Sequence, residues 1–242
     1  MIKTIIGFNF AIHPEHMLKL PILFLVFSLL TLSEPEIPTH TYSPSTEKSE
    51  GVYDRLLNLT AALPSKQVFD LAANGWEKLQ GNINNPILTI IDFSLPSTEK
   101  RMWVIDMNAA KVLLNTVVSH GRNSGQLMAK SFSNQPESYK SSLGFYKTAE
   151  TYFGKHGYSL RLDGLEKGFN DQARNRAIVI HGADYAKEEF AAATGRLGRS
   201  LGCPALPSEI SKEAIDYIKE GSLLFVFGND PSYLQASALL QP

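Results

Sequence analysis

GRSLGCPAL, residues Gly198 to Leu206, contains Cys203, the only cysteine among 242 residues. Gly202 permits a left-handed or strained backbone directly before the thiol, and Pro204 stiffens the chain directly after it. Two interpretations are open: a buried, inert, small apolar side chain, or a nucleophile held in a fixed loop. A nucleophile needs a base that forms the thiolate and donors that hold the developing oxyanion.

Three His-Gly pairs offer such a base, at His120, His156 and His181. His181 ends the apolar run AIVI, and a strand end is where a rigid scaffold presents a side chain to a cleft. A backbone carbonyl on the second ring nitrogen would fix the tautomer of this base. A structural histidine at a strand end is the alternative interpretation.

Residues close to Cys203 in sequence are candidates for the other groups that a cysteine nucleophile needs. The backbone amides of Cys203 and of Gly202 or Leu201 are candidate oxyanion donors. Arg196 and Arg199 are close enough in sequence to lower the pKa of the thiol or to bind a carboxylate. A solvated basic loop explains the same two arginines equally well.

From Pro86 onward, short apolar segments rich in β-branched and aromatic residues alternate with Gly, Pro, Ser and Asn. This pattern predicts a mainly β fold, mostly antiparallel, with flanking helices (α+β). RMWVIDM and VLLNTVV, joined by NAAK, are typical of a β-hairpin with Asn108 near the turn. The predicted strands are 87–95, 101–107, 111–121, 143–150, 158–165, 176–182 and 222–228.

Helical periodicity occurs on both sides of this region. In SKQVFDLAANGWEKLQ, residues 65–80, apolar side chains recur at helical spacing and Ser65 is placed as an N-cap. VYDRLLNLTAAL, residues 52–63, precedes it as a second helical segment, and a third helix is predicted from Glu209 to Gly221.

The N-terminus has the layout of a secretory signal. LPILFLVFSLLTL, Leu20 to Leu32, follows Lys19 and precedes a polar stretch. A spanning helix needs roughly 20 apolar residues, so this block is short for one, and an uncleaved membrane anchor is the alternative. We predict export to the periplasm or cell envelope, where a lone cysteine cannot form an intramolecular disulfide and its retention needs a reason.

The chain divides into four predicted segments. They are a signal peptide or N-terminal anchor (1–33), a flexible spacer rich in Pro, Ser, Thr and Glu (34–51), a helical segment (52–84) and a β-rich domain (85–242). The formal net charge of −1 offers no basic field, so nucleic acid is excluded as an expected partner.

The strand-ending His-Gly and the Ser-x-Gly-Cys of GRSLGCPAL together resemble the L,D-transpeptidase catalytic domain, the YkuD type of peptidoglycan cross-linking enzyme. SSLGFYKTAETYFGKHGYSLRLDGLEKGFND, RAIVIHGADY and GRSLGCPAL are most similar to the murein L,D-transpeptidase catalytic domain subfamily. The resemblance covers roughly residues 86 to 228. It implies a β-sandwich or barrel catalytic domain that acts on peptidoglycan stem peptides and needs neither a metal nor an organic cofactor.

The resemblance also implies residue roles. Cys203 matches the family nucleophile, His181 the general base, and Gly182 the residue whose carbonyl orients that base. Ser200 and Gly202 match the Ser and Gly ahead of the cysteine. The thiolate would attack the carbonyl of the third, diamino acid residue of a stem peptide, and D-alanine would leave. An amine would resolve the thioester into a cross-link, or water would, making the enzyme an L,D-carboxypeptidase.

Two positions depart from the family pattern. The family usually has histidine where this chain has Leu201, and arginine shortly after the cysteine, where this chain has 204–206, Pro-Ala-Leu. The second departure removes a partner for a substrate carboxylate, which Arg199 or Arg196 would replace. Further substrate-binding candidates are His120, Arg122, Asn123, Ser124 and Tyr158.

Two other functions stay open. A zinc peptidase would use His120, His156, His181 and Cys203, but the sequence has no HExxH and no close His-x-His spacing. A non-catalytic, exported wall-binding module is the other alternative, because the departures at 201 and 204 fit a cleft that has lost activity.

Overall fold

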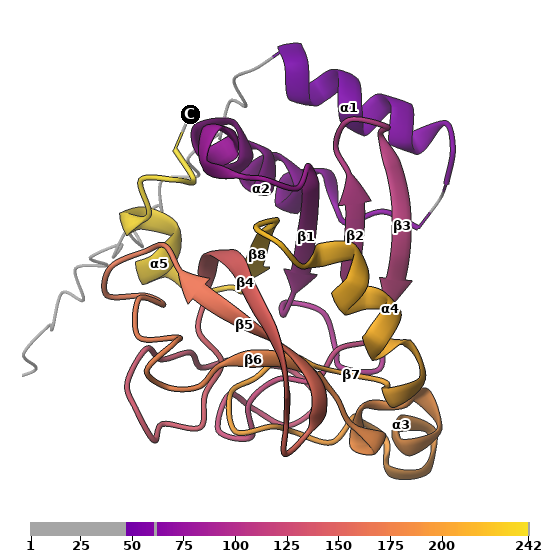
Figure 1. The fold of residues 1–242 in the computed structure, drawn as a ribbon, viewed down its shortest axis with the longest axis vertical. Coiled ribbons are helices and arrows are strands. Elements are labelled where there is room, and N and C mark those ends of the chain that lie inside the picture. Colours follow the sequence, from indigo (N-terminus) through magenta and orange to yellow (C-terminus); the bar gives the residue numbers. More distant parts are fainter. Residues whose placement is uncertain (1–46, 61, 242) are drawn as a thin grey trace, which may run out of the picture. The chain divides into compact units, whose positions relative to one another are not determined.

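The computed structural model describes residues 47–60 and 62–241 (Figure 1). The predicted signal or anchor, 1–33, and the predicted spacer up to residue 46 lie outside the described residues. Helix α1 spans Glu47–Leu57 and therefore begins inside the range predicted as spacer. The helix is stabilised there because Val52, Tyr53 and Leu56 are buried, and packing of one apolar face contributes more to a short helix than intrinsic propensity.

The described residues form one sheet of eight strands in the order β3-β2-β1-β8-β4-β5-β6-β7. Neighbouring strands are antiparallel except β1 with β8 and β6 with β7, which are parallel. The strands are β1 Ile87–Asp92, β2 Met102–Asp106, β3 Lys111–Thr116, β4 Gly144–Gly154, β5 Gly157–Gly164, β6 Val179–Gly182, β7 Ala205–Leu206 and β8 Leu223–Phe227. The predicted mainly β, mostly antiparallel fold is confirmed.

The predicted hairpin is present as β2 and β3, with Asp106 opposite Lys111. The Asp106 carboxylate accepts hydrogen bonds from the Asn108 and Ala109 amides at 2.9 and 2.8 Å, which closes the turn.

Strand β3 ends at Thr116, five residues short of the predicted end at 121. The remaining residues leave β2 because their backbone pairs elsewhere: Ser119 bridges Ala205, and Gly121 bridges Ser200. This departure carries the chain toward GRSLGCPAL.

Helix α2, Lys66–Leu79, is the predicted helix, and the Ser65 hydroxyl caps it by accepting a hydrogen bond from the Val68 amide at 3.3 Å. Helix α4, Ser208–Ile218, is also predicted. Short elements were missed: η1 Gln80–Asn82, η2 Asp184–Ala186, α3 Glu188–Thr194, β7 Ala205–Leu206 and α5 Pro231–Ala236. They are too brief for an apolar period to show in the sequence.

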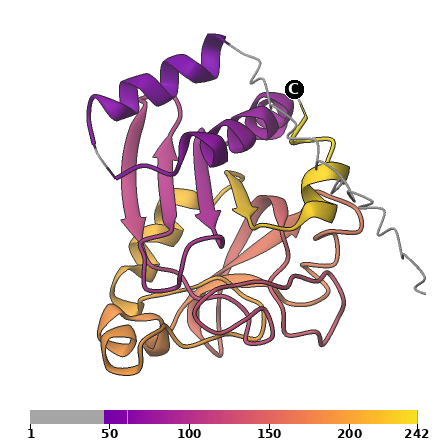
Figure 2. The same ribbon diagram turned by 180° about the vertical axis from the view of Figure 1, so that it is seen from behind.

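Helix α2 shares one hydrophobic core with the sheet. It approaches β4 closely at Gly75, where a Cβ atom would lie 2.1 Å from Cζ of Phe145. Figure 1 shows α4 in front of β1–β3, and Figure 2 shows these strands from behind, with α4 beyond them. Among the described helices, none is both long and apolar enough to cross a bilayer.

Candidate active site

The segment Gly198–Pro204, called here the cysteine loop, leads from α3 to β7. It is bound along one side to residues 119–122. Ser200 exchanges two backbone hydrogen bonds with this segment, at 3.0 and 2.8 Å, and the Ala205 carbonyl accepts a third at 2.8 Å. Backbone pairing with residues 119–122 therefore holds the loop at Ser200 and at its exit into β7.

Within the loop, Ser200 closes a tight turn. Its hydroxyl accepts a hydrogen bond from the Gly202 amide at 3.0 Å and donates one to the Cys203 carbonyl at 2.6 Å. The turn needs a φ of 126° at Gly202, a value that residues with a Cβ rarely adopt. Because the Gly202 amide is engaged, it is not free for an oxyanion. The amides of Cys203 and Leu201 donate to no group in the described part of the chain, so these two remain as candidate donors.

The Cys203 side chain is half-buried and free of a disulfide. Its Sγ donates to the carbonyl of Ala177 at 3.6 Å. Burial raises the pKa of the Cys203 thiol, while the Val179 amide and the Arg176 guanidinium act in the opposite direction. The thiol therefore faces the segment that leads into β6.

His181 lies near the end of β6 and is 2% exposed. Its Nδ1 is 2.9 Å from the carbonyl oxygen of Gly182, so Nδ1 carries the proton and Nε2 keeps a lone pair. Burial lowers the pKa of His181, the Gly182 carbonyl opposes this, and the charge of a protonated His156 lowers the pKa further. The ring therefore favours its neutral form, which is the form a general base needs.

The pairing of β6 with β7 relates the histidine to the cysteine. His181 is opposite Ala205, so Cys203 lies two residues before the partner of His181. Paired strands are roughly 4.8 Å apart, so the loop that carries Cys203 enters β7 beside the strand that carries His181. The thiol is turned toward Ala177, and no hydrogen bond joins Cys203 to His181 in the described chain.

Two predicted substrate-binding residues are buried instead. His120 is fully buried, and its Nδ1 accepts a hydrogen bond from Nη2 of Arg101 at 2.8 Å. Burial and Arg101 lower the pKa of His120 to about 4. Ser124 is also buried, and its hydroxyl accepts a hydrogen bond from the Ser141 amide at 2.9 Å. Both side chains support the backbone behind the cysteine loop, and a substrate in solution does not reach them.

Other predicted residues lie at the surface or partly buried. The Arg122 guanidinium stacks 4.3 Å from the ring centre of Tyr139. Arg199 donates to the carbonyls of Arg122 and Gly125, at 2.9 and 3.0 Å. Burial and the neighbouring charges of Arg196 and Arg122 lower the pKa of Arg199, so the three arginines lie together.

Two candidates point toward other partners. The Asn123 side chain is exposed and donates to the Ser138 carbonyl at 2.9 Å. The Tyr158 hydroxyl, on β5, donates to Asp216 of α4 at 3.1 Å.

Sequence reasoning missed the residues that face the thiol from elsewhere in the chain, namely Arg176, Ala177 and Tyr185. As groups that lower the pKa of the thiol, only arginines close to Cys203 in sequence were considered, whereas Arg176 directly precedes the apolar run AIVI. Its position at the start of the strand that carries His181 is the signal that was available.

The histidines do not gather as a zinc site would require. His156 stacks on His181, but His120 is buried against Arg101. In the described residues, no three His, Cys, Asp or Glu side chains come together as metal ligands.

A family model described as the L,D-transpeptidase catalytic domain matches residues 61–227. The chain belongs to this family. The match runs through α2 and all eight strands of the sheet, and it includes both His181 and Cys203. The matched residues include part of the predicted helical segment 52–84, from residue 61 onward.

Solved structures offer distant likenesses. The chain is similar to an L,D-transpeptidase from Mycobacterium smegmatis (13% identity, TM-score 0.36, 59% of each chain covered). It is also similar to L,D-transpeptidase 1 from Mycobacterium tuberculosis (13% identity, TM-score 0.35, 60% of this chain and 63% of that chain covered). A third similar structure is an L,D-transpeptidase from Stackebrandtia nassauensis (15% identity, TM-score 0.37, 79% of this chain and 96% of that chain covered).

The chain spans less than two thirds of the first two of these structures. Comparison with curated protein sequences gives no significant match. Membership of the L,D-transpeptidase family therefore rests on the family model alone.

Proposed function

We propose that this chain is a peptidoglycan L,D-transpeptidase that works through a cysteine thioester, with Cys203 as nucleophile and His181 as general base. Family membership supports the reaction class. The observation that supports the residue roles is the β6–β7 pairing: His181, whose Nδ1 is bound by the Gly182 carbonyl, is opposite Ala205, two residues after the only cysteine of the sequence.

In the first half-reaction the Cys203 side chain rotates from Ala177 toward Nε2 of His181, which takes the thiol proton. The sulfur attacks the carbonyl carbon of the third, diamino acid residue of the donor stem. The oxyanion accepts a hydrogen bond from the Cys203 amide. The amide C–N bond then breaks, His181 returns the proton to the leaving D-alanine nitrogen, and a thioester remains.

In the second half-reaction an acceptor amine loses a proton to His181 and attacks the thioester carbonyl. The C–S bond breaks, the thiolate is released and recovers its proton, and the two stems are joined. Water in place of the amine gives L,D-carboxypeptidase activity. The half-buried position of Cys203 is compatible with either acceptor.

Arg122, Arg196 and Arg199 are the proposed contacts for carboxylates of the stem peptides. They lie together, and none of them forms an ion pair with a carboxylate in the described chain. Guanidinium groups bind carboxylates well when no internal carboxylate competes. Leu201, 57% exposed, adds an apolar surface beside them. His120 and Ser124 are left out of this set because they are buried.

Access to peptidoglycan requires export. We propose export to the periplasm or cell envelope on the basis of the apolar block Leu20–Leu32, with retention of that block as a membrane anchor as the alternative.

The deciding experiment is digestion of purified peptidoglycan with the protein, followed by mass analysis of the muropeptides. New cross-links to the third stem residue support transpeptidation, and loss of terminal D-alanine alone supports carboxypeptidation. Cys203→Ser is the matched control, because it removes the thiol and changes one atom. Activity retained by Cys203→Ser would overturn the cysteine mechanism.

A non-catalytic wall-binding module is the second candidate, and one observation favours it: the thiol hydrogen bonds to Ala177 and not to His181. Mass spectrometry after exposure to a carbapenem separates the two. A working site gains one covalent adduct that Cys203→Ala lacks. An unmodified wild-type thiol that also resists alkylation, together with retained binding to peptidoglycan, would support the inactive module.

A further inference from the structure

Arg176 lies in the segment between β5 and β6, and four hydrogen bonds fix its guanidinium. Nη1 donates to the carbonyl of Ser133 at 2.7 Å and to the hydroxyl of Ser142. Nη2 donates to the carbonyl of Lys140 at 2.6 Å and to the hydroxyl of Ser138 at 3.3 Å. All four acceptors are neutral, so the contacts orient the guanidinium but leave its charge uncompensated.

The same guanidinium lies against the cysteine loop. A Cβ atom at Gly202 would be 3.3 Å from Nη2 of Arg176 and 2.9 Å from the Lys140 carbonyl oxygen. The Ser141 hydroxyl donates to the Gly202 carbonyl at 3.3 Å, which joins the loop to the segment that Arg176 holds. Arg176 therefore packs on the residue directly before the nucleophile.

The charges around Arg176 indicate that its guanidinium stabilises the ionised form of the Cys203 thiol. Within the described residues, no carboxylate lies within ion-pair distance of Arg176. The other titratable group that faces the thiol is the phenol of Tyr185, whose pKa burial raises to about 12, so it stays neutral near pH 7. Arg176 is the charged group that faces Cys203, and opposite charges at short range favour the ionised form.

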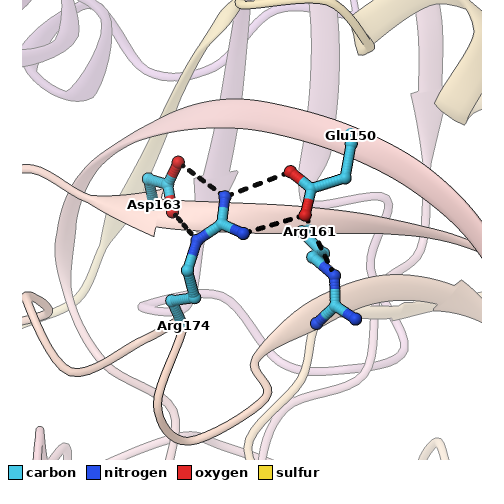
Figure 3. Close-up of polar contacts among 4 residues, drawn as sticks. All are labelled: Glu150, Arg161, Asp163 and Arg174. Atoms are coloured by element: carbon cyan, nitrogen blue, oxygen red, sulfur yellow. Dashed lines mark hydrogen bonds and ion pairs between the residues drawn. The ribbon is translucent and has the colours of Figure 1, made fainter.

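The segment that presents Arg176 is anchored two residues earlier (Figure 3). Arg174 binds Asp163 of β5 at 2.5 and 2.9 Å and Glu150 of β4 at 2.8 and 3.1 Å, a pair of two-pronged contacts. Exposed ion pairs contribute little energy individually, but this geometry fixes the direction of the segment. Immediately after Arg176, Ala177 adopts a φ of 53° and turns its carbonyl to the thiol.

We propose that Arg176 is a positioning residue that holds the cysteine loop and supplies the positive charge that stabilises the Cys203 thiolate. This role rests on the proposed function in that Cys203 is taken as the nucleophile. Arg176, and not Arg196 or Arg199 as the sequence suggested, is then the arginine that tunes the thiol.

The test is the pH dependence of alkylation of Cys203 by iodoacetamide in the folded chain, which requires no peptidoglycan. Arg176→Gln should slow alkylation at pH 7 about tenfold and displace the rate profile to higher pH, because the thiolate fraction falls. Arg176→Lys keeps a charge and should lie closer to wild type. Arg55→Gln is the matched control, since its guanidinium donates to the Gly51 carbonyl within α1, and its profile should be unchanged.

A folded Arg176→Gln protein with the wild-type alkylation profile would overturn the role. If Arg176→Gln does not fold, Arg176→Lys decides: a profile close to that of wild type supports the role of the charge. A profile displaced to higher pH although the charge is kept would overturn it. Failure of the proposed function is separate: inactivity on peptidoglycan with an Arg176-dependent thiol profile would leave the positioning role intact.

Discussion

The imidazole rings of His156 and His181 stack with centroids 4.3 Å apart and planes 25° from parallel. His156 is exposed in the turn between β4 and β5, whereas His181 is buried. The turn of one hairpin therefore covers the proposed base, and the protonation of the outer ring bears on the inner one.

Replacing His156 by Ala should raise the pKa of His181, because water gains access to the ring and a nearby positive charge is lost. The base acts in its neutral form, so the acid limb of the kcat/KM profile should move to higher pH. His156→Phe keeps a stacked ring without the charge and should give a smaller displacement. An acid limb unchanged in both variants would contradict the coupling.

Replacing His181 by Ala should slow acylation of Cys203 by a carbapenem at pH 7 by about 100-fold or more, the usual effect of losing a general base. The time course of adduct formation by mass spectrometry measures this. In the structure the thiol faces Ala177, so the experiment also asks whether it turns to His181 during reaction. Equal rates in variant and wild type would remove His181 from the mechanism.

Gly75→Ala should destabilise the fold by about 1–3 kcal/mol, because the new methyl group would overlap the Phe145 ring in a packed core. Urea unfolding followed by circular dichroism measures the loss. Gly81→Ala is the matched control: no atom lies within 4 Å of its new Cβ, and its unfolding free energy should be close to wild type. Similar losses in the two variants would argue against close packing of α2.

His120 should make the fold sensitive to acid. Its pKa is about 4 in the folded chain and about 6.5 when unfolded, so the unfolded chain binds the proton first as the pH falls. The stability that His120 contributes is complete above pH 6.5 and is lost between pH 6.5 and 4, by about 3 kcal/mol in total.

His120→Asn retains an acceptor for Arg101 but does not titrate. The unfolding free energy of wild type should therefore fall relative to this variant between pH 7.5 and 4.5. A constant difference across that range would show that folding does not change the pKa of His120.

Features with a local physical cause could be predicted from the sequence. The Ser65 cap and the Asp106 turn depend on groups within a few residues, and the strands follow from β-branched runs between turn residues. The assignment of His181 as the base for Cys203 came from the resemblance to the L,D-transpeptidase family.

Features that depend on distant segments could not be predicted. His120 ends an apolar run just as His181 does, but the sequence does not reveal that its ring enters the core beside Arg101. Strand β3 ends at Thr116 because the residues after it pair with a segment some 80 residues later in the chain. No local sequence pattern predicts this pairing.

By itself, the sequence determined seven of the eight strands, helices α2 and α4, and the motifs that contain His181 and Cys203, because each has a local pattern. Only the tertiary structure decided what surrounds the thiol: the Ala177 carbonyl accepts a hydrogen bond from it, the Gly202 amide is bound to Ser200, and the Arg176 guanidinium is the nearby charge. The physical reason is that burial, desolvation and charge at Cys203 arise from segments brought together by the sheet, and these act through space and not along the chain.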